Sequence, residues 1–105
     1  MTLLFEAIDP RGRYVFCTTE QWTNHVLAKR PWMKNWLDFV IKAIKTPTMI
    51  CSDANLSTRE IYYLIPSPQS GAYLKVVVQM IEDKGQVVTA FPVDSGKSGE
   101  VILWP

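Results

Sequence analysis

The sequence is poor in the residues from which most metal centres, disulfide frameworks and membrane anchors are built. It contains one histidine and two cysteines in 105 residues. A structural zinc site needs four ligands at short spacing, and two isolated cysteines do not make a disulfide framework. No stretch reaches the roughly 20 apolar residues that cross a bilayer. We therefore expect no metal or other cofactor, reduced cysteines in small core positions, and no contact with a membrane.

An excess of charge of one sign is also lacking, because eleven basic and ten acidic residues give a net charge of +1. The strongly basic surface of many nucleic-acid-binding proteins is therefore excluded, although a local basic patch is compatible with this balance. The apolar run at residues 1–5 is followed at once by Glu6, so it is too short for the core of a signal peptide. These features predict a cytoplasmic protein.

The residues that are present predict one folded domain over residues 1–105, since 48% hydrophobic and 20% charged residues are ordinary values for a globular chain. The clearest element is residues 73–81, where apolar residues alternate with a mixed set. The apolar positions are Leu74, Val76, Val78 and Met80. Alternation with a period of two predicts a strand with one apolar face and one mixed face. We expect this strand to lie at the centre of a sheet whose mixed face is open to a ligand.

The N-terminal half predicts a hairpin and two helices. Residues 3–8 and 13–17 are short apolar runs separated by Asp-Pro-Arg-Gly, a sequence typical of a turn. Thr18, with a glutamine three residues later, fits a capping box and predicts a helix that ends before Pro31. A second helix is predicted from Pro31 to about Lys45, because its apolar residues recur at the spacing of three and four that one helix face requires.

The C-terminal half predicts strands. Residues 59–65, 73–81 and 86–93 are joined by short turns, which favours an antiparallel meander. Residues 48–51 and 100–104 predict two shorter strands. The predicted fold is therefore α+β, with an N-terminal β-hairpin and two helices packed on one face of an antiparallel sheet of about four strands.

The first predicted helix carries a candidate acid–base group. His25 and Lys29 are four residues apart and therefore share a face, and Arg30 follows. Histidine exchanges protons near neutral pH, and a nearby cation favours its neutral, basic form. This pattern suits a general base that acts on a phosphodiester, with Lys29 and Arg30 binding the substrate. The alternative is an ordinary surface histidine beside a solvated basic pair.

The predicted strands carry the other candidates. Arg59 and Tyr63 share one face of their strand and Tyr62 lies on the other; a guanidinium binds phosphate through its planar donors, and a tyrosine can stack on a base. Lys75 lies on the mixed face of residues 73–81 and can bind phosphate there. The alternatives are a rim arginine paired with a glutamate, core tyrosines, and a surface lysine.

Thr89 interrupts the apolar strand at residues 86–93, on a face that the alternation predicts it shares with Val87 and Phe91. Its hydroxyl can bind a phosphate oxygen. The alternative is a threonine that is present because it favours a strand.

Taken in order, these segments resemble the small nuclease-like domains of the barnase–EndoU–colicin–RelE superfamily, including its phage-associated members. The resemblance is carried by the turn at residues 9–13, by Trp22 and His25 in the first helix, by the strand at residues 59–63, and by Val-Val-Thr-Ala-Phe at residues 87–91. It covers most of the chain, although each piece is short.

The resemblance implies a toxin-type endoribonuclease that cleaves RNA without a metal, with an antitoxin or immunity protein as a partner. The positions that match the family's polar residues are His25, Arg59, Tyr62 or Tyr63, and Thr89. The chain departs from the family at Arg30, where a second histidine is usual, and at Phe91, where a hydroxylated aromatic residue is usual. The rival predictions are a catalytically inactive member or binding module that acts through an open sheet face, and a homodimer that pairs edge strands.

Overall fold

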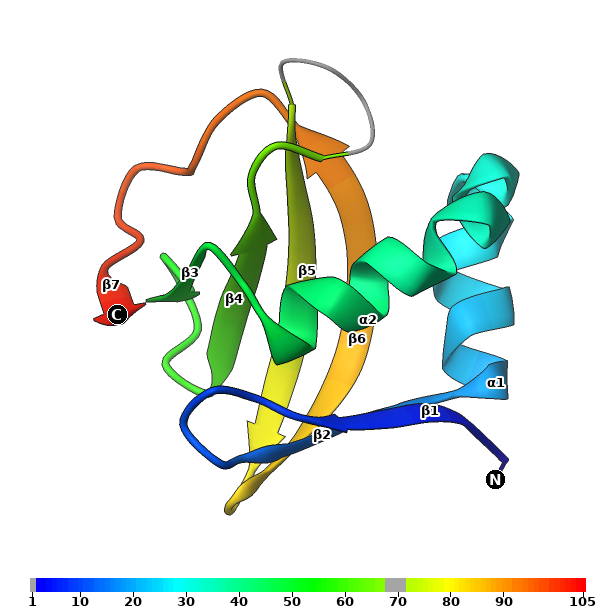
Figure 1. Ribbon diagram of the computed structural model, residues 1–105, viewed down its shortest axis with the longest axis horizontal. Helices are drawn as coiled ribbons and strands as arrows, with labels where there is room; N and C mark the ends of the chain where they lie inside the picture. Colours follow the sequence, from blue (N-terminus) through cyan, green and yellow to red (C-terminus); the bar gives the residue numbers. More distant parts are fainter. Residues whose placement is uncertain (1, 68–71) are drawn as a thin grey trace.

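A single sheet with β5 at its centre organises the molecule. The computed structural model describes residues 2–67 and 72–105. The strands follow the order β1-β2-β6-β5-β4-β3-β7 (Figure 1). The middle strand β5, Tyr73–Ile81, pairs antiparallel with β4, Arg59–Leu64, and with β6, Lys84–Val93. The alternating segment is thus the central strand, and the predicted antiparallel meander is confirmed.

The N-terminal hairpin joins this sheet instead of packing on it. It consists of β1, Leu3–Ile8, and β2, Tyr14–Thr18, which pair antiparallel. β2 then pairs with the start of β6 in parallel, over Tyr14–Phe16 on one strand and Lys84–Gln86 on the other. A parallel pair within an otherwise antiparallel sheet makes the sheet mixed.

The opposite edge of the sheet is formed by two short strands that the sequence predicts. β3, Met49–Ser52, pairs with β4, and β7, Ile102–Trp104, pairs with β3 as the outermost strand. Within the described residues the sheet therefore has seven strands. The predicted α+β class and N-terminal hairpin are confirmed, whereas the sheet is larger than the predicted four or so strands and includes a parallel pair, because alternation reveals a strand but not the strand with which it pairs.

Both predicted helices are present, and each changes type along its length. α1, Thr19–Gln21, continues as the π-helical segment η1, Trp22–Leu27, and the Thr18 hydroxyl accepts from the Gln21 amide at 3.1 Å as an N-cap. η2, Pro31–Trp36, is a 3-10 helix that continues as α2, Leu37–Lys45. None of the helices in the described chain is long and apolar enough to cross a membrane.

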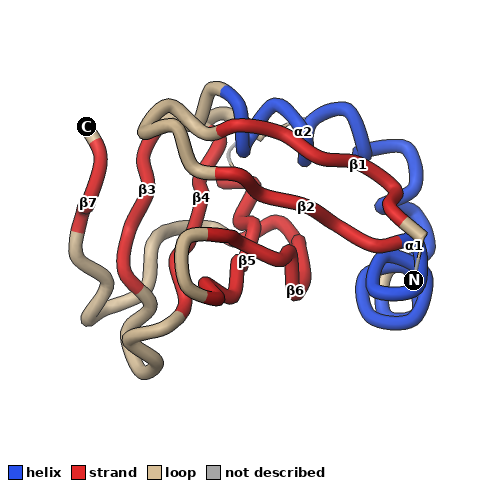
Figure 2. Tube along the Cα trace, turned by 90° about the horizontal axis from the view of Figure 1, so that it is seen from below, coloured by secondary structure: helices blue, strands red, loops and turns tan. Residues whose placement is uncertain are grey.

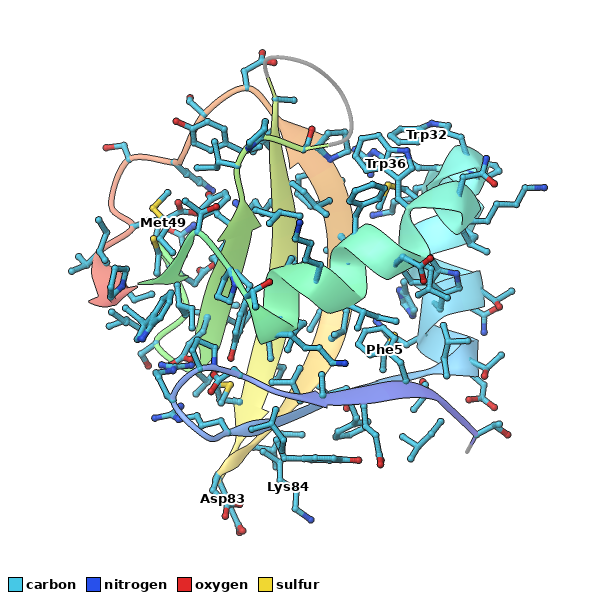
Figure 3. The ribbon with its side chains drawn as sticks, in the orientation of Figure 1. Phe5, Trp32, Trp36, Met49, Asp83 and Lys84 are labelled. Atoms are coloured by element: carbon cyan, nitrogen blue, oxygen red, sulfur yellow. The ribbon has the colours of Figure 1, made fainter. Side chains whose placement is uncertain are left out.

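The helices lie along one side of the sheet, as Figure 2 shows. The apolar face of β5 is buried there against α2, which contributes Val40 and Ile44. Phe5 of β1 is part of this core, and Figure 3 places it between the hairpin and α2. At the far end of the helical layer, the rings of Trp32 and Trp36 pack edge to face with centroids 5.2 Å apart (Figure 3). Each fully buried aliphatic side chain contributes about 1.5–3 kcal/mol, so this core supplies the main stabilisation.

A β-bulge in β6 changes which residues share a face. Val77 pairs with Thr89 and Val78 pairs with Val87, so the register passes over Val88. Val87 consequently lies in the helix-side core, whereas Phe91 packs on the other side of the sheet. The prediction that Val87, Thr89 and Phe91 share one face is wrong, because a bulge adds one residue and reverses the alternation beyond it.

Candidate functional site

The sheet face that points away from the helices carries four of the predicted site residues. Tyr63 of β4, Lys75 of β5 and Phe91 of β6 are directly paired and form one row. Thr89 lies in the next row, opposite Val77, and Arg59 lies in the row after that. Strand pairing therefore brings residues from three consecutive strands onto one surface.

The connection from β6 to β7 covers the upper part of this surface. Residues 94–99 are exposed, but the carboxylate of Glu100 turns inward. Its Oε1 accepts from the Tyr63 hydroxyl at 2.6 Å and from the Lys97 amide at 3.1 Å, and its Oε2 accepts from Lys75 Nζ at 3.2 Å. Tyr63 is fully buried and Lys75 is 9% exposed. The prediction of an open mixed face is wrong at this place, because an internal acid neutralises Lys75.

This environment also changes the acidity of the tyrosine. Burial, and then the hydrogen bond to the Glu100 carboxylate, raise the pKa of Tyr63 well above its ordinary value of 10.0. The phenol is therefore held neutral and serves as a hydrogen-bond donor.

Arg59 lies apart from these groups. Its Nε donates to Gln79 Oε1 at 3.1 Å, so its partner is an amide and not the glutamate of the alternative prediction. β4 and β6 are separated by β5, which places Arg59 about 10 Å or more from Thr89 at ordinary strand spacing. The structure does not bring these two predicted residues together.

Tyr62 lies on the helix side, in a buried ionic network. Its hydroxyl donates to Asp9 Oδ2 at 2.6 Å, and Arg11 Nη2 donates to the Tyr62 hydroxyl at 3.1 Å. Arg11 also forms ion pairs with Asp9 at 2.9 Å and with Glu60 at 2.6 Å. These contacts fasten the β1–β2 turn to β4. Tyr62 is therefore part of the fold's scaffold and is not available to a ligand.

The remaining candidates lie beside the outer edge of β6. β2 pairs only with the start of β6, and η1 stands beside the rest of this edge (Figure 1). Gln21 Nε2 donates to the Val88 carbonyl at 2.6 Å, and the Arg30 guanidinium lies 4.9 Å from the centroid of the Phe91 ring. His25 lies in η1, four residues after Gln21, and η1 contacts β6.

His25, Arg30, Thr89 and Phe91 are called the β6-edge site below. His25 is exposed, and Arg30 and Thr89 are half-buried. No carboxylate in the described ranges forms an ion pair with His25, Arg30 or the exposed Lys29, which lies one turn beyond His25. The site therefore combines an imidazole, an unneutralised guanidinium and a hydroxyl.

Sequence reasoning missed Glu100, which forms the ion pair with Lys75 and accepts the hydrogen bond from Tyr63. It lies 25 positions beyond Lys75, in a loop, and no local pattern connects the two. Only the return of the chain across the sheet brings them together.

In the part of the chain that the structure describes, no group of three or more His, Cys, Asp or Glu side chains could hold a metal ion. Comparisons with protein-family models, curated proteins and solved structures find no match.

Proposed function

We propose that this protein is a toxin-type, metal-independent endoribonuclease-like domain, akin to the barnase–EndoU–colicin–RelE superfamily, and that the β6-edge site is its reaction centre. One observation carries the proposal: η1, which holds the chain's only histidine, lies beside a strand that also presents a hydroxyl and a guanidinium without an acidic partner among the described residues. These are the groups that can move a proton and stabilise charge during cleavage of a phosphodiester.

RNA supplies its own nucleophile in this reaction. The ribose 2′-oxygen attacks the adjacent phosphorus, and the bond from phosphorus to the 5′-oxygen breaks. The products are a 2′,3′-cyclic phosphate and a 5′-hydroxyl. Because the nucleophile is internal, a bound metal is not needed to generate it.

Each of the three polar residues of the site has one role in this step. His25 takes the proton of the 2′-hydroxyl as general base. Arg30 binds the negative charge that develops on the pentacoordinate phosphorus, and Thr89 donates to a non-bridging oxygen. The leaving 5′-oxygen takes its proton from solvent, since the position at which the resembling domains usually carry a second histidine is Arg30 here.

The backbone of η1 supports the same location. π-helical turns are rare and recur at functional sites, and His25 lies within such a turn. Lys29 and Arg59 contact neighbouring phosphates of the strand in this proposal, because both are cations that reach solvent and neither has an acidic partner among the described residues. Tyr62 takes no part in the reaction, because its hydroxyl donates to Asp9 within the scaffold.

The test is cleavage of end-labelled RNA by the purified protein in EDTA. We expect products that end in a 2′,3′-cyclic phosphate and no cleavage where the ribose lacks its 2′-hydroxyl. His25→Ala should lower the rate by about 100-fold or more, as loss of a general base does. Asn24→Ala, an exposed neighbour on the same helix, is the matched control and should leave the rate unchanged.

Two results would contradict the proposal. Cleavage that survives His25→Ala at the full rate removes the histidine from the reaction. If the unaltered protein binds RNA but forms no product, it is a binding module. The departures from the family at Arg30 and Phe91 favour this rival function.

A further inference from the structure

Lys75 is the only lysine in the described chain that is buried, and a single carboxylate neutralises it at close range. The side chains of Lys75 and Glu100 are 11% and 5% exposed. The Tyr63 hydroxyl and the Lys97 amide bind the other oxygen of the same carboxylate. Glu100 thus occupies a formed anion site made of an ammonium, a phenol and a main-chain N–H.

These donors are not specific for a carboxylate. An ammonium, a hydroxyl and a backbone amide are also the groups that bind phosphate oxygens. A phosphodiester carries one negative charge, as the Glu100 carboxylate does, so an exchange between them keeps the buried site neutral. The exchange therefore avoids leaving the Lys75 ammonium as an unpaired buried charge.

The chain that delivers Glu100 is suited to such an exchange. Residues 94–99 before it are all exposed. Gly99 has a φ of +94°, a conformation that glycine adopts readily, and this residue directs the chain inward immediately before Glu100. Glu100 can therefore leave the site by rotation of its side chain with movement of residues 94–99, while Val101 stays hydrogen-bonded to Ser52, and solvent hydrates the released charge.

The anion site adjoins the β6-edge site. Lys75 Nζ lies 5.9 Å from the centroid of the Phe91 ring, and the Arg30 guanidinium lies 4.9 Å from the same centroid. One phenyl ring therefore separates the buried cation from the cation assigned to the reacting phosphate.

We propose that Lys75 and Tyr63 form a second phosphate-binding subsite, with Glu100 as its exchangeable internal occupant. The neighbouring phosphate of an RNA strand displaces Glu100 when the strand binds at the β6-edge site. The identity of the strand rests on the proposed function, whereas the anion site itself requires no cleavage.

The test uses Glu100→Gln, which keeps the shape of the side chain and removes the competing charge. Inorganic phosphate is the probe, and chloride at equal ionic strength is the reference. We expect the variant to bind phosphate at least about tenfold more tightly than the unaltered protein, seen as a phosphate-dependent rise in Tm. Adding Lys75→Met to this variant should abolish the gain. The matched control is Glu6→Gln, since Glu6 accepts from the Tyr14 hydroxyl at 2.7 Å on the exposed surface.

A Glu100→Gln variant without gain in phosphate affinity, or a gain that survives Lys75→Met, overturns the subsite. Should Glu100→Gln not fold, the main-chain amide NMR signals of Gly96, Lys97 and Gly99 in the unaltered protein give the answer. They should shift with phosphate and not with chloride, and constant signals refute the exchange. Phosphate binding without RNA cleavage supports the subsite and contradicts the nuclease function. Cleavage that depends on His25, without phosphate exchange at Glu100, supports the nuclease function and contradicts the subsite.

Discussion

Two adjacent tyrosines of β4 make the same contact on opposite faces of the sheet. Tyr62 and Tyr63 are both fully buried, and each donates a hydrogen bond of 2.6 Å to a carboxylate. For Tyr62 the acceptor is Asp9, in the turn between β1 and β2. For Tyr63 it is Glu100, in the connection from β6 to β7. The two sites therefore differ in the segment that supplies the acid.

At the Asp9 site, every charged group is paired within the β1–β2 turn or with Glu60. Asp9 Oδ1 also accepts from the main-chain amides of Arg11 and Arg13, at 2.8 and 2.9 Å, so the carboxylate shapes its own turn. Glu60 provides a second acid for the two arginines. Glu100 has one buried cation and a largely exposed loop behind it. The same kind of hydrogen bond is therefore a permanent contact for Asp9, which belongs to a tight turn. It is an exchangeable contact for Glu100, which follows a surface loop.

The largest expected difference is in stability. Asp9→Ala should lower the free energy of unfolding by about 3 kcal/mol, because it removes the acceptor of the buried Tyr62 hydroxyl and of two main-chain amides, while Arg11 keeps its ion pair with Glu60. Glu100→Ala should cost about 1 kcal/mol, because the loop can admit water to Lys75. Urea denaturation of both variants measures the two values. Equal losses would show that Glu100 is as fixed as Asp9.

The two cysteines report on the two faces separately. Cys17 lies in the helix-side core, and Cys51 lies on the other face of the sheet. The charges of Glu100 and Lys75 act on the Cys51 thiol. Burial raises the pKa of Cys17 to about 12, and burial, followed by the charge of Glu100, raises the pKa of Cys51. Both thiols should therefore react only after the structure opens.

We expect a thiol reagent to modify Cys51 about tenfold faster than Cys17 under native conditions, which corresponds to about 1.4 kcal/mol less for the opening that exposes it. The modified residue is identified by mass spectrometry. Glu100→Gln should widen the difference, and Glu6→Gln should not. Equal rates for the two thiols would mean that the Glu100 connection opens only with the whole fold.

Acid should weaken the Asp9 site, and this is the smallest expected effect. Burial alone would raise the pKa of Asp9, but hydrogen bonds from Tyr62, from the Arg13 amide and from Arg11 outweigh it and lower the pKa below 3.8. The unfolded chain therefore binds the proton first, and the contribution of Asp9 is lost as pH falls below its ordinary pKa. Urea denaturation from pH 5 downward should show a steeper loss in the unaltered protein than in Asp9→Asn. Parallel curves would assign the acid sensitivity to other groups.

Local sequence pattern predicts the parts of this fold that depend on one segment at a time. The alternation in residues 73–81 identifies β5, and the same rule places Tyr62 and Tyr63 on opposite faces. Helical spacing identifies both helices, and the small size of Cys17 and Cys51 is consistent with their buried, unpaired state. These features follow from backbone periodicity, which neighbouring residues alone determine.

Other features needed segments that lie far apart to meet. The parallel contact of β2 with β6, the bulge that moves Val87 to the helix side, and the burial of Lys75 under Glu100 have no local signal. The position of η1, which carries His25, beside β6 also has no local signal, because it depends on β2 pairing with β6 only as far as Gln86.

The amino-acid sequence by itself determined which stretches become strands and helices, and which side of β4 and β5 each residue faces. The tertiary structure alone decided which charges meet, since an ion pair across the sheet depends on the path of the chain and not on its local period. In this protein, that path separates Arg59 from Thr89 and brings Glu100 into an ion pair with Lys75. It also leaves Arg30 without an acidic partner among the described residues, and this free charge is what the proposed function uses.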